Sequence, residues 1–256
     1  MYASGELASE NQRVNIFGYY IKTITFFMAC LFFIIATVPA VADNQSRIQQ
    51  IISQYKSAPS DLKGASTQNM INELLLNPSS RKALDSSTKE MIEEQFNQNL
   101  EAETIILASL AGVESAQEKI KLLAARPIPK EYWFGTDWAA RLMMARLGDQ
   151  VSLNNILTIA NKQNLHAKST TVTIDLKYVP QLTSLDFLKN QLFSDERLEP
   201  IKDTVPGSLV ATYAASSLAI ILQNFPLDYR EDFSYSDDEV IQAREWMSQQ
   251  TEWKFR

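Results

Sequence analysis

The side chains that commonly carry out acid–base or nucleophilic catalysis are scarce in this chain. Its one histidine, His166, follows a polar stretch over 161–165, which favours a solvated residue over a general base. The spacing Ser-x-x-Lys, which can set a lysine amine beside a nucleophilic serine, occurs at Ser53/Lys56, Ser60/Lys63 and Ser86/Lys89. The companion motifs Ser-Asp-Asn and Lys-Thr-Gly do not follow, and no G-x-S-x-G elbow is present. We therefore predict no catalytic residue, and we expect a protein that is not an enzyme.

Metal and cofactor patterns are equally weak. The acidic segments 228–232 and 237–239 lack the alternating oxygen ligands and central glycine of a calcium loop. Zinc sites draw on clusters of histidine and cysteine, and this chain has one of each. The seven glycines have no phosphate-binding spacing. We expect neither a metal nor a cofactor.

Aromatic residues form the remaining concentrations. Tyr132, Trp133, Phe134 and Trp138 follow a double-proline segment, and we predict that they form part of a binding surface. A second group consists of Trp246, Trp253 and Phe255. For both groups the alternative is packing of the linker and the tail onto helices; contact with a partner or a glycan is the functional interpretation.

The N-terminal segment predicts export. An uncharged apolar run over 24–38 follows Lys22, and Ala40 and Ala42 supply the small residues of a signal-peptidase site. We predict a signal peptide over 1–42, cleaved after Ala42, and a periplasmic or secreted mature protein without a stable membrane span.

Other interpretations of the same segment remain open. An uncleaved anchor is the main alternative, although a span needs roughly 20 apolar residues and Pro39 ends this run early. Lipidation at Cys30 is disfavoured, because that residue lies in the middle of the run. Glu6 and Glu10 make the leading segment unusually long, which a mis-assigned start codon, with initiation at Val14, would explain.

Composition limits the partners. The formal net charge is −6, so the chain as a whole lacks the basic footprint of a nucleic-acid-binding protein. The single cysteine lies within the predicted signal peptide, so the mature protein would have no disulfide and would depend on packing for stability.

Helical periodicity recurs throughout the mature chain. A run over 104–110 is apolar on every side and is expected to be a buried helix. Further helices are expected over 137–147, closed by Gly148, and over 184–193 and 208–222.

Two capping boxes and one ambiguous segment complete the helical pattern. The capping boxes are expected at 87–90 and 236–239. The β-branched stretch 169–178 fits a strand, an extended connection or a helix of poor propensity. The mature chain therefore divides into a helical segment 43–125, a proline- and aromatic-rich linker 126–136 and a second helical segment 137–256.

The second helical segment carries a family resemblance. The stretch 139–149, AARLMMARLGD, resembles the small-residue helix and glycine turn of HEAT-like repeat proteins, and 215–221, ASSLAII, is a partial second copy. The resemblance covers about 136–250. It implies an all-α fold in which αα-hairpins stack as a short HEAT-like superhelix and bind partners on the repeat surface.

These observations together predict an exported, non-enzymatic helical-repeat protein. It would act as a protein-binding or scaffold module in the cell envelope, with a protein as its partner and no binding to nucleic acid. Two alternatives stay open: an inhibitor or immunity-type protein that neutralises an envelope enzyme or toxin, and a hydrolase that uses carboxylates in a cleft.

Overall fold

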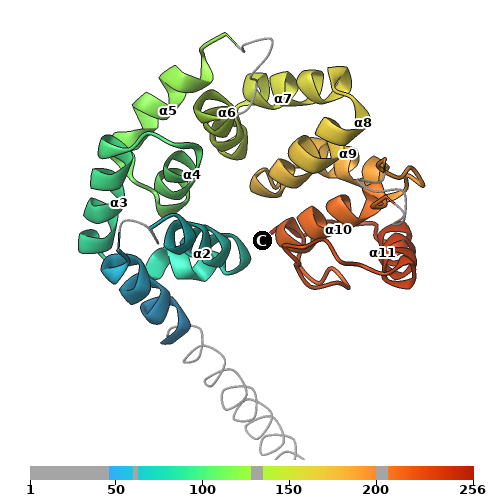
Figure 1. The fold of residues 1–256 in the computed structure, drawn as a ribbon, viewed down its shortest axis with the longest axis horizontal. Helices are drawn as coiled ribbons and strands as arrows, with labels where there is room; N and C mark the ends of the chain where they lie inside the picture. Colours follow the sequence, from blue (N-terminus) through green and yellow to red (C-terminus); the bar gives the residue numbers. More distant parts are fainter. Residues whose placement is uncertain (1–45, 60–62, 128–134, 200–206) are drawn as a thin grey trace, which may run out of the picture. The chain divides into compact units, whose positions relative to one another are not determined.

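The structure is a computed structural model of the 256-residue chain, and it describes residues 46–59, 63–127, 135–199 and 207–256. Contacts divide the chain into two compact units, 1–50 and 51–256. Of the first unit, the described residues 46–50 are helical. The second unit, which contains all the labelled helices, is described below (Figure 1).

The first part of the second unit surrounds one buried helix. Its elements are α2 (Lys63–Leu76), the 3-10 turn η2 (Pro78–Ala83), α3 (Ser86–Gln98), α4 (Ala102–Ala111), the 3-10 turn η3 (Glu114–Ala116) and α5 (Gln117–Ala124). Helix α4 contacts α2, α3 and α6, and it buries residues on every side of its axis. The prediction of a buried helix over 104–110 is confirmed.

The second part differs from the first in the irregular helical turns that follow α8. Its elements are α6 (Thr136–Arg146), α7 (Gln150–Lys162), α8 (Leu165–Ala167), the π-helical turn η4 (Lys168–Thr173), the 3-10 turn η5 (Leu176–Tyr178), α9 (Leu182–Leu192), α10 (Val210–Ile221) and α11 (Asp237–Gln249). The bounds of α6, α9 and α10 agree within two residues with the helices expected from periodicity.

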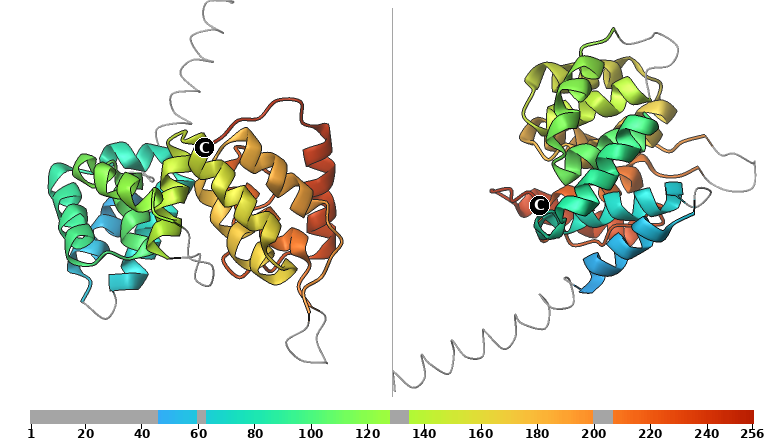
Figure 2. Two further views of the ribbon diagram at one scale, coloured as in Figure 1. Left: turned by 90° about the horizontal axis from the view of Figure 1, so that it is seen from above. Right: turned by 90° about the vertical axis from the view of Figure 1, so that its left-hand side faces the viewer.

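Most helices contact their neighbours in the chain. The pairs α5–α6, α6–α7, α9–α10 and α10–α11 all pack together, and α11 lies at an outer edge (Figure 2). The contact between α2 and α10 is different, because it joins the beginning of this unit to a helix near its end. The helices of the second unit thus follow a curved path that brings α10 back beside α2 (Figure 1).

The predicted all-α class is confirmed. In the four described ranges the ordered elements are helices, and extended pairing is limited to two isolated bridges, Arg197 with Leu209 and Leu222 with Phe255. None of the described helices has the combination of length and hydrophobicity needed to cross a bilayer. The predicted signal peptide over 1–42 lies outside the described residues.

Helix ends show where local sequence rules hold. Gly148 has a left-handed φ of 100° after α6, as its expected C-terminal position requires. The capping box at Ser236 and Glu239 is confirmed, since each side chain hydrogen-bonds the other residue's backbone N–H. The box expected at 87–90 is wrong: Asp85 caps α3 by accepting from the Thr88 backbone N–H at 2.7 Å, because a carboxylate two positions earlier is available.

The β-branched stretch 169–178 is helical, so the strand interpretation is wrong and the interpretation as a helix of poor propensity is confirmed. It runs through η4 and η5, with Val172, Leu176 and Tyr178 buried along it. Within the described ranges the segment has no neighbouring strand to pair with, and packing against α10 outweighs its weak helical preference. Ser217 of α10 donates a hydrogen bond to the Thr173 carbonyl at 2.7 Å, which helps to fix the irregular turn.

Candidate functional site

Of the four aromatic residues predicted to form a binding surface beside the linker, only Trp138 lies within the described residues. Tyr132, Trp133 and Phe134 lie outside the described residues, as does much of the linker 126–136, so their role in binding stays a prediction. Trp138 is described. It is 3% exposed, and its ring N–H donates to the Asp175 carboxylate at 2.6 Å. Trp138 is therefore a packing and hydrogen-bonding residue inside the domain and offers no exposed ring face to a partner.

Asp175 is the carboxyl group most affected by this arrangement. Burial raises its pKa to about 6, against the opposing effects of the Trp138 hydrogen bond and the nearby Lys177 charge. The other described carboxyl groups with a shifted pKa, at Asp85, Asp149, Asp232 and Glu239, are all lowered. A hydrolytic cleft would need two facing carboxylates with perturbed pKa values. The raised group found here instead accepts a hydrogen bond from a buried indole, which is a structural arrangement.

Other candidate groups are exposed or dispersed. His166 lies on the short helix α8 and is exposed, as its polar surroundings suggested. Among the described residues, no three histidine, cysteine, aspartate or glutamate side chains lie close enough together to hold a metal ion.

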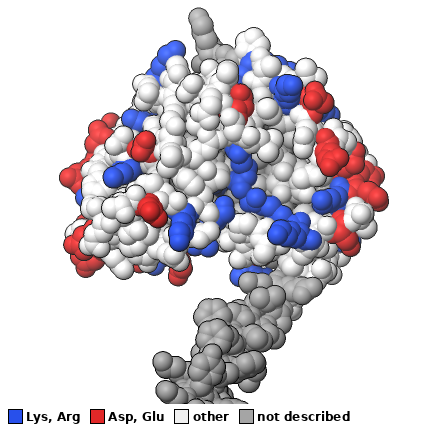
Figure 3. Space-filling view, turned by 180° about the vertical axis from the view of Figure 1, so that it is seen from behind, with Lys and Arg blue, Asp and Glu red and all other residues white. Residues whose placement is uncertain are grey.

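Charge is unevenly distributed over the surface. On the face turned away from the viewer in Figure 1, basic side chains gather near the middle and acidic ones lie mainly toward the sides (Figure 3). Apart from this surface view, the charges of Arg81 and Arg146 interact: burial, and then the charge of Arg81, lowers the pKa of Arg146 to about 10. Backbone carbonyls of Leu74 and Tyr178 accept hydrogen bonds from the two guanidinium groups, at 3.1 and 2.8 Å. These contacts hold a local positive charge in an acidic chain.

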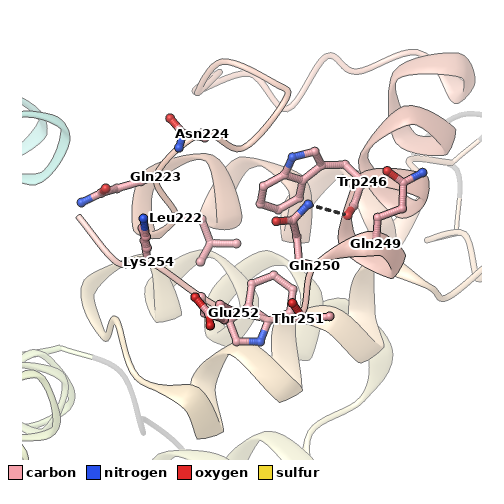
Figure 4. A pocket seen from close by; sticks show the side chains of 10 residues that line it. Leu222, Gln223, Asn224, Trp246, Gln249, Gln250, Thr251, Glu252 and Lys254 are labelled. Carbon is pink, nitrogen blue, oxygen red and sulfur yellow. Dashed lines mark hydrogen bonds between the residues drawn. The ribbon is translucent and has the colours of Figure 1, made fainter.

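An open pocket lies at the end of α11, where the tail of the chain returns to the end of α10 (Figure 4). We call it the tryptophan pocket. Its cavity is about 300 Å³, and its walls come from 222–224, Trp246 and 249–254. The pocket therefore needs both the end of α10 and the segment from α11 to the tail.

Backbone pairing holds the tryptophan pocket together. Leu222 and Phe255 form an isolated antiparallel bridge. The Gln223 N–H donates to the Lys254 carbonyl at 2.8 Å, and the Arg256 N–H donates to the Ile221 carbonyl at 2.9 Å. The tail therefore lies along the end of α10 in a fixed register, which gives the pocket a preformed wall.

Two indole rings dominate the apolar part of this pocket. Trp246 and Trp253 are each partly exposed, with ring centroids 6.3 Å apart and planes inclined at 58°. Phe225 meets the Trp246 ring edge-to-face at 5.6 Å and supports it from the side. Because the two indoles are inclined, they do not cover each other face to face.

The polar part of the pocket is rich in amides. The Gln250 amide donates to the Trp246 carbonyl at 3.3 Å, and the Gln223 amide donates to the Phe255 carbonyl at 2.9 Å. Asn224 sits at a left-handed turn with φ 59°, a conformation that asparagine tolerates well. Gln249 is exposed at the rim.

A separate group of exposed aliphatic side chains lies where α6, α7 and α9 meet. We call it the apolar patch and define it by Leu147, Val151 and Leu182, which are 61%, 68% and 61% exposed. Gln181 brings these helix ends together: its amide donates to the Ala145 carbonyl, and its oxygen accepts from the Gln150 amide at 3.1 Å.

The sequence indicated the two sites unequally. Trp246 and Trp253 were recognised as an aromatic group, but the amides beside them were not, since isolated glutamines carry no motif. The apolar patch was missed because its residues lie at three separate helix ends, outside the buried stripes that periodicity detects.

Comparisons with known proteins give no match. No protein-family model matches it, and neither a curated protein sequence nor a solved structure does. The HEAT-like resemblance therefore remains a prediction from the residues at 139–149 and 215–221.

Proposed function

We propose that the protein is an exported, non-enzymatic module of the cell envelope that binds a protein partner through a HEAT-like array of helices. The observation that carries this proposal is the apolar patch. Isolated exposed leucines are ordinary on protein surfaces, whereas neighbouring ones are a feature of interaction sites. Here three aliphatic side chains, each more than half exposed, stand on adjoining helix ends.

Burial of these side chains supplies the driving force for association. Each square ångström of apolar surface removed from water contributes roughly 25 cal/mol. The patch is bordered by the Gln150 and Gln181 amides, which can hydrogen-bond at an interface rim. A rigid base of paired helix ends reduces the entropy lost on binding.

Replacing apolar side chains of the patch with carboxylates tests the proposal. Val151→Asp and Leu182→Asp place a carboxylate in the expected interface, where desolvation without a counter-ion weakens binding. We expect capture of envelope proteins by the purified protein to lose a discrete partner in both variants, with melting temperature unchanged. Leu122→Asp is the matched control, because Leu122 is 69% exposed and lies on α5, outside the patch.

The capture experiment also separates the alternatives. If both patch variants retain every partner that the parent captures, the patch is not the interface and the proposal fails. A tight one-to-one complex with an enzyme encoded beside this chain would instead support the inhibitor alternative. Cleavage after Ala42, and with it export, is tested by N-terminal sequencing of protein recovered from the periplasm; an uncleaved precursor in the membrane fraction would support the anchored alternative.

A further inference from the structure

We propose that the tryptophan pocket is a second binding site, and that it takes an uncharged saccharide chain. This site is independent of the proposed protein interface, since the pocket is formed by residues between Leu222 and Lys254 and the apolar patch by other helices. The inference depends on four features of the pocket: its ring faces, its amides, its charge, and its size and rigidity.

The ring faces suit a sugar. A pyranose ring has one face made largely of C–H groups, which carry a slight positive charge, and the π face of an indole is negative. Trp246 and Trp253 both line the pocket and are partly exposed, and their 58° inclination means that the two rings do not stack on each other. Phe225 meets the Trp246 ring edge-to-face and so helps to hold that platform in place.

The amides suit hydroxyl groups. Each sugar hydroxyl both donates and accepts hydrogen bonds, and the asparagine and glutamine side chains do the same. Gln223 and Gln250 each use an amide N–H to hold a backbone carbonyl, which orients the amide and leaves its oxygen as an acceptor. Asn224 and Gln249 add two further amides at the wall, and the described residues include no side-chain hydrogen bond that occupies them.

The charge of the pocket favours a neutral ligand. Its lining has one carboxylate, Glu252, and one ammonium group, Lys254, so the two formal charges cancel. A site for a phosphate or a polyanion would need an excess of cationic donors. The carboxylate can instead accept hydrogen bonds from hydroxyl groups, as the amides do.

The size and rigidity of the pocket suit a short stretch of a chain. Its volume, about 300 Å³, is at the lower end of the range for ligand pockets, roughly 300–1,000 Å³. The rim residues Gln249, Thr251, Glu252 and Lys254 are exposed, so a longer chain can continue outward on either side. The tail is already held by its pairing with 221–223, so binding does not need to order this wall.

Binding to defined oligosaccharides tests the inference. Protein purified after expression of the full chain is titrated with maltohexaose, cellohexaose and chitohexaose, with binding followed by calorimetry. We expect at least one of these neutral chains to bind, and Trp253→Ala to weaken that binding by about 10-fold or more. Phe193→Ala, which removes an exposed ring elsewhere on the surface, should leave the affinity unchanged.

A second variant guards against a folding artefact. Gln249→Ala removes an exposed amide that does not contribute to the core, so its circular dichroism should match the parent while saccharide affinity falls several-fold. Failure of all three oligosaccharides to bind overturns the inference, as does binding that is insensitive to both variants. Preferential binding of heparin, or of apolar peptides, in a Trp253-dependent manner would assign the pocket to an anion or a peptide instead. Partner capture through the apolar patch should be unaffected by Trp253→Ala, which keeps the two proposals separable.

Discussion

Trp138 and the tryptophan pocket use the same side chain in opposite surroundings. The Trp138 ring is 3% exposed and donates its N–H to the Asp175 carboxylate. Trp246 and Trp253 are partly exposed, and they are inclined to each other beside amide groups. An indole with its N–H satisfied and its faces packed is a structural element, whereas an indole with a free face in a concave, polar setting is a recognition element.

The backbone around each tryptophan accounts for the difference. Trp138 faces η5 and the irregular turns after α8, which fold over it and supply Asp175. Trp246 stands on α11, an edge helix, beside the buried stripe of Val240, Ala243 and Met247. Ring exposure is therefore set by the layer of structure outside the helix that carries the ring.

Removal of the buried ring should have the largest effect. Trp138→Ala leaves a cavity and takes away the hydrogen-bond donor to Asp175, so we expect the free energy of unfolding to fall by about 3–5 kcal/mol. Urea denaturation followed by circular dichroism measures this loss. A loss near 1 kcal/mol would mean that Trp138 contributes no more to stability than an exposed tryptophan. The distinction between a structural Trp138 and the tryptophans of the pocket would then be wrong.

The contribution of Asp175 to the free energy of unfolding depends on pH. Its folded pKa, about 6, lies above the ordinary value of about 3.9, so the folded state holds the extra proton between these values and stability falls as pH rises through them. Asp175→Asn keeps an acceptor for Trp138 without the charge. Relative to the parent, we expect this variant to gain up to about 3 kcal/mol of stability between about pH 4 and pH 7.

The parent-minus-variant difference isolates this group. Glu239 has a pKa lowered to about 2, chiefly by its hydrogen bond from Arg230, but it titrates in both proteins and cancels. Identical pH profiles for parent and variant would mean that the carboxyl beside Trp138 is solvated.

Ala215→Leu tests the packing of the helix that lies against the irregular turns. Ala215 is fully buried in α10, which contacts α9 and η4, so a larger side chain forces strain costing about 1–3 kcal/mol. Ala65→Leu is the matched control, because Ala65 lies exposed in α2 and should change stability by less than about 0.5 kcal/mol. Equal effects of the two substitutions would contradict the close packing of α10.

The smallest effect on stability is expected in the pocket. Trp253→Ala removes a partly exposed ring near the tail, and we expect the free energy of unfolding to fall by only about 1 kcal/mol. The contrast with Trp138→Ala in the same denaturation assay is the sharpest form of the comparison. A loss as large as that of Trp138→Ala would make Trp253 a core residue.

Local signals in the sequence predicted much of the fold. Periodicity located α6, α9 and α10, and the capping box at Ser236 marked the start of α11, because these signals depend on residues within one or two turns. The Asp85 cap was missed, because Ser87 and Glu90 offered a competing capping box. For 169–178 the sequence did not decide between a helix, an extended connection and a strand, because β-branched residues fit a strand as well.

The sites were harder to predict than the helices. The tryptophan pocket joins residues 222–224 to 246–254, and the apolar patch joins three helix ends. Such sites depend on which distant segments contact each other in the folded chain, and a single sequence does not show those tertiary contacts directly. Trp138 shows the reverse error: its type suggested exposure, but the turns that cover it come from 37 residues later.

The contact between α2 and α10 has a consequence for how the chain folds. Most helix pairs here are neighbours in sequence and can form quickly. Asn72 of α2, in contrast, is hydrogen-bonded at 2.5 Å to Glu231, which lies in the turns after α10 and 159 residues away. Closing so long a loop before other contacts are in place is entropically unfavourable. We therefore expect refolding to recover helical signal first and the α2–α10 closure last. Until that step, part of the apolar surface of α10 stays open to water, which makes the nearly folded chain the species most prone to aggregate.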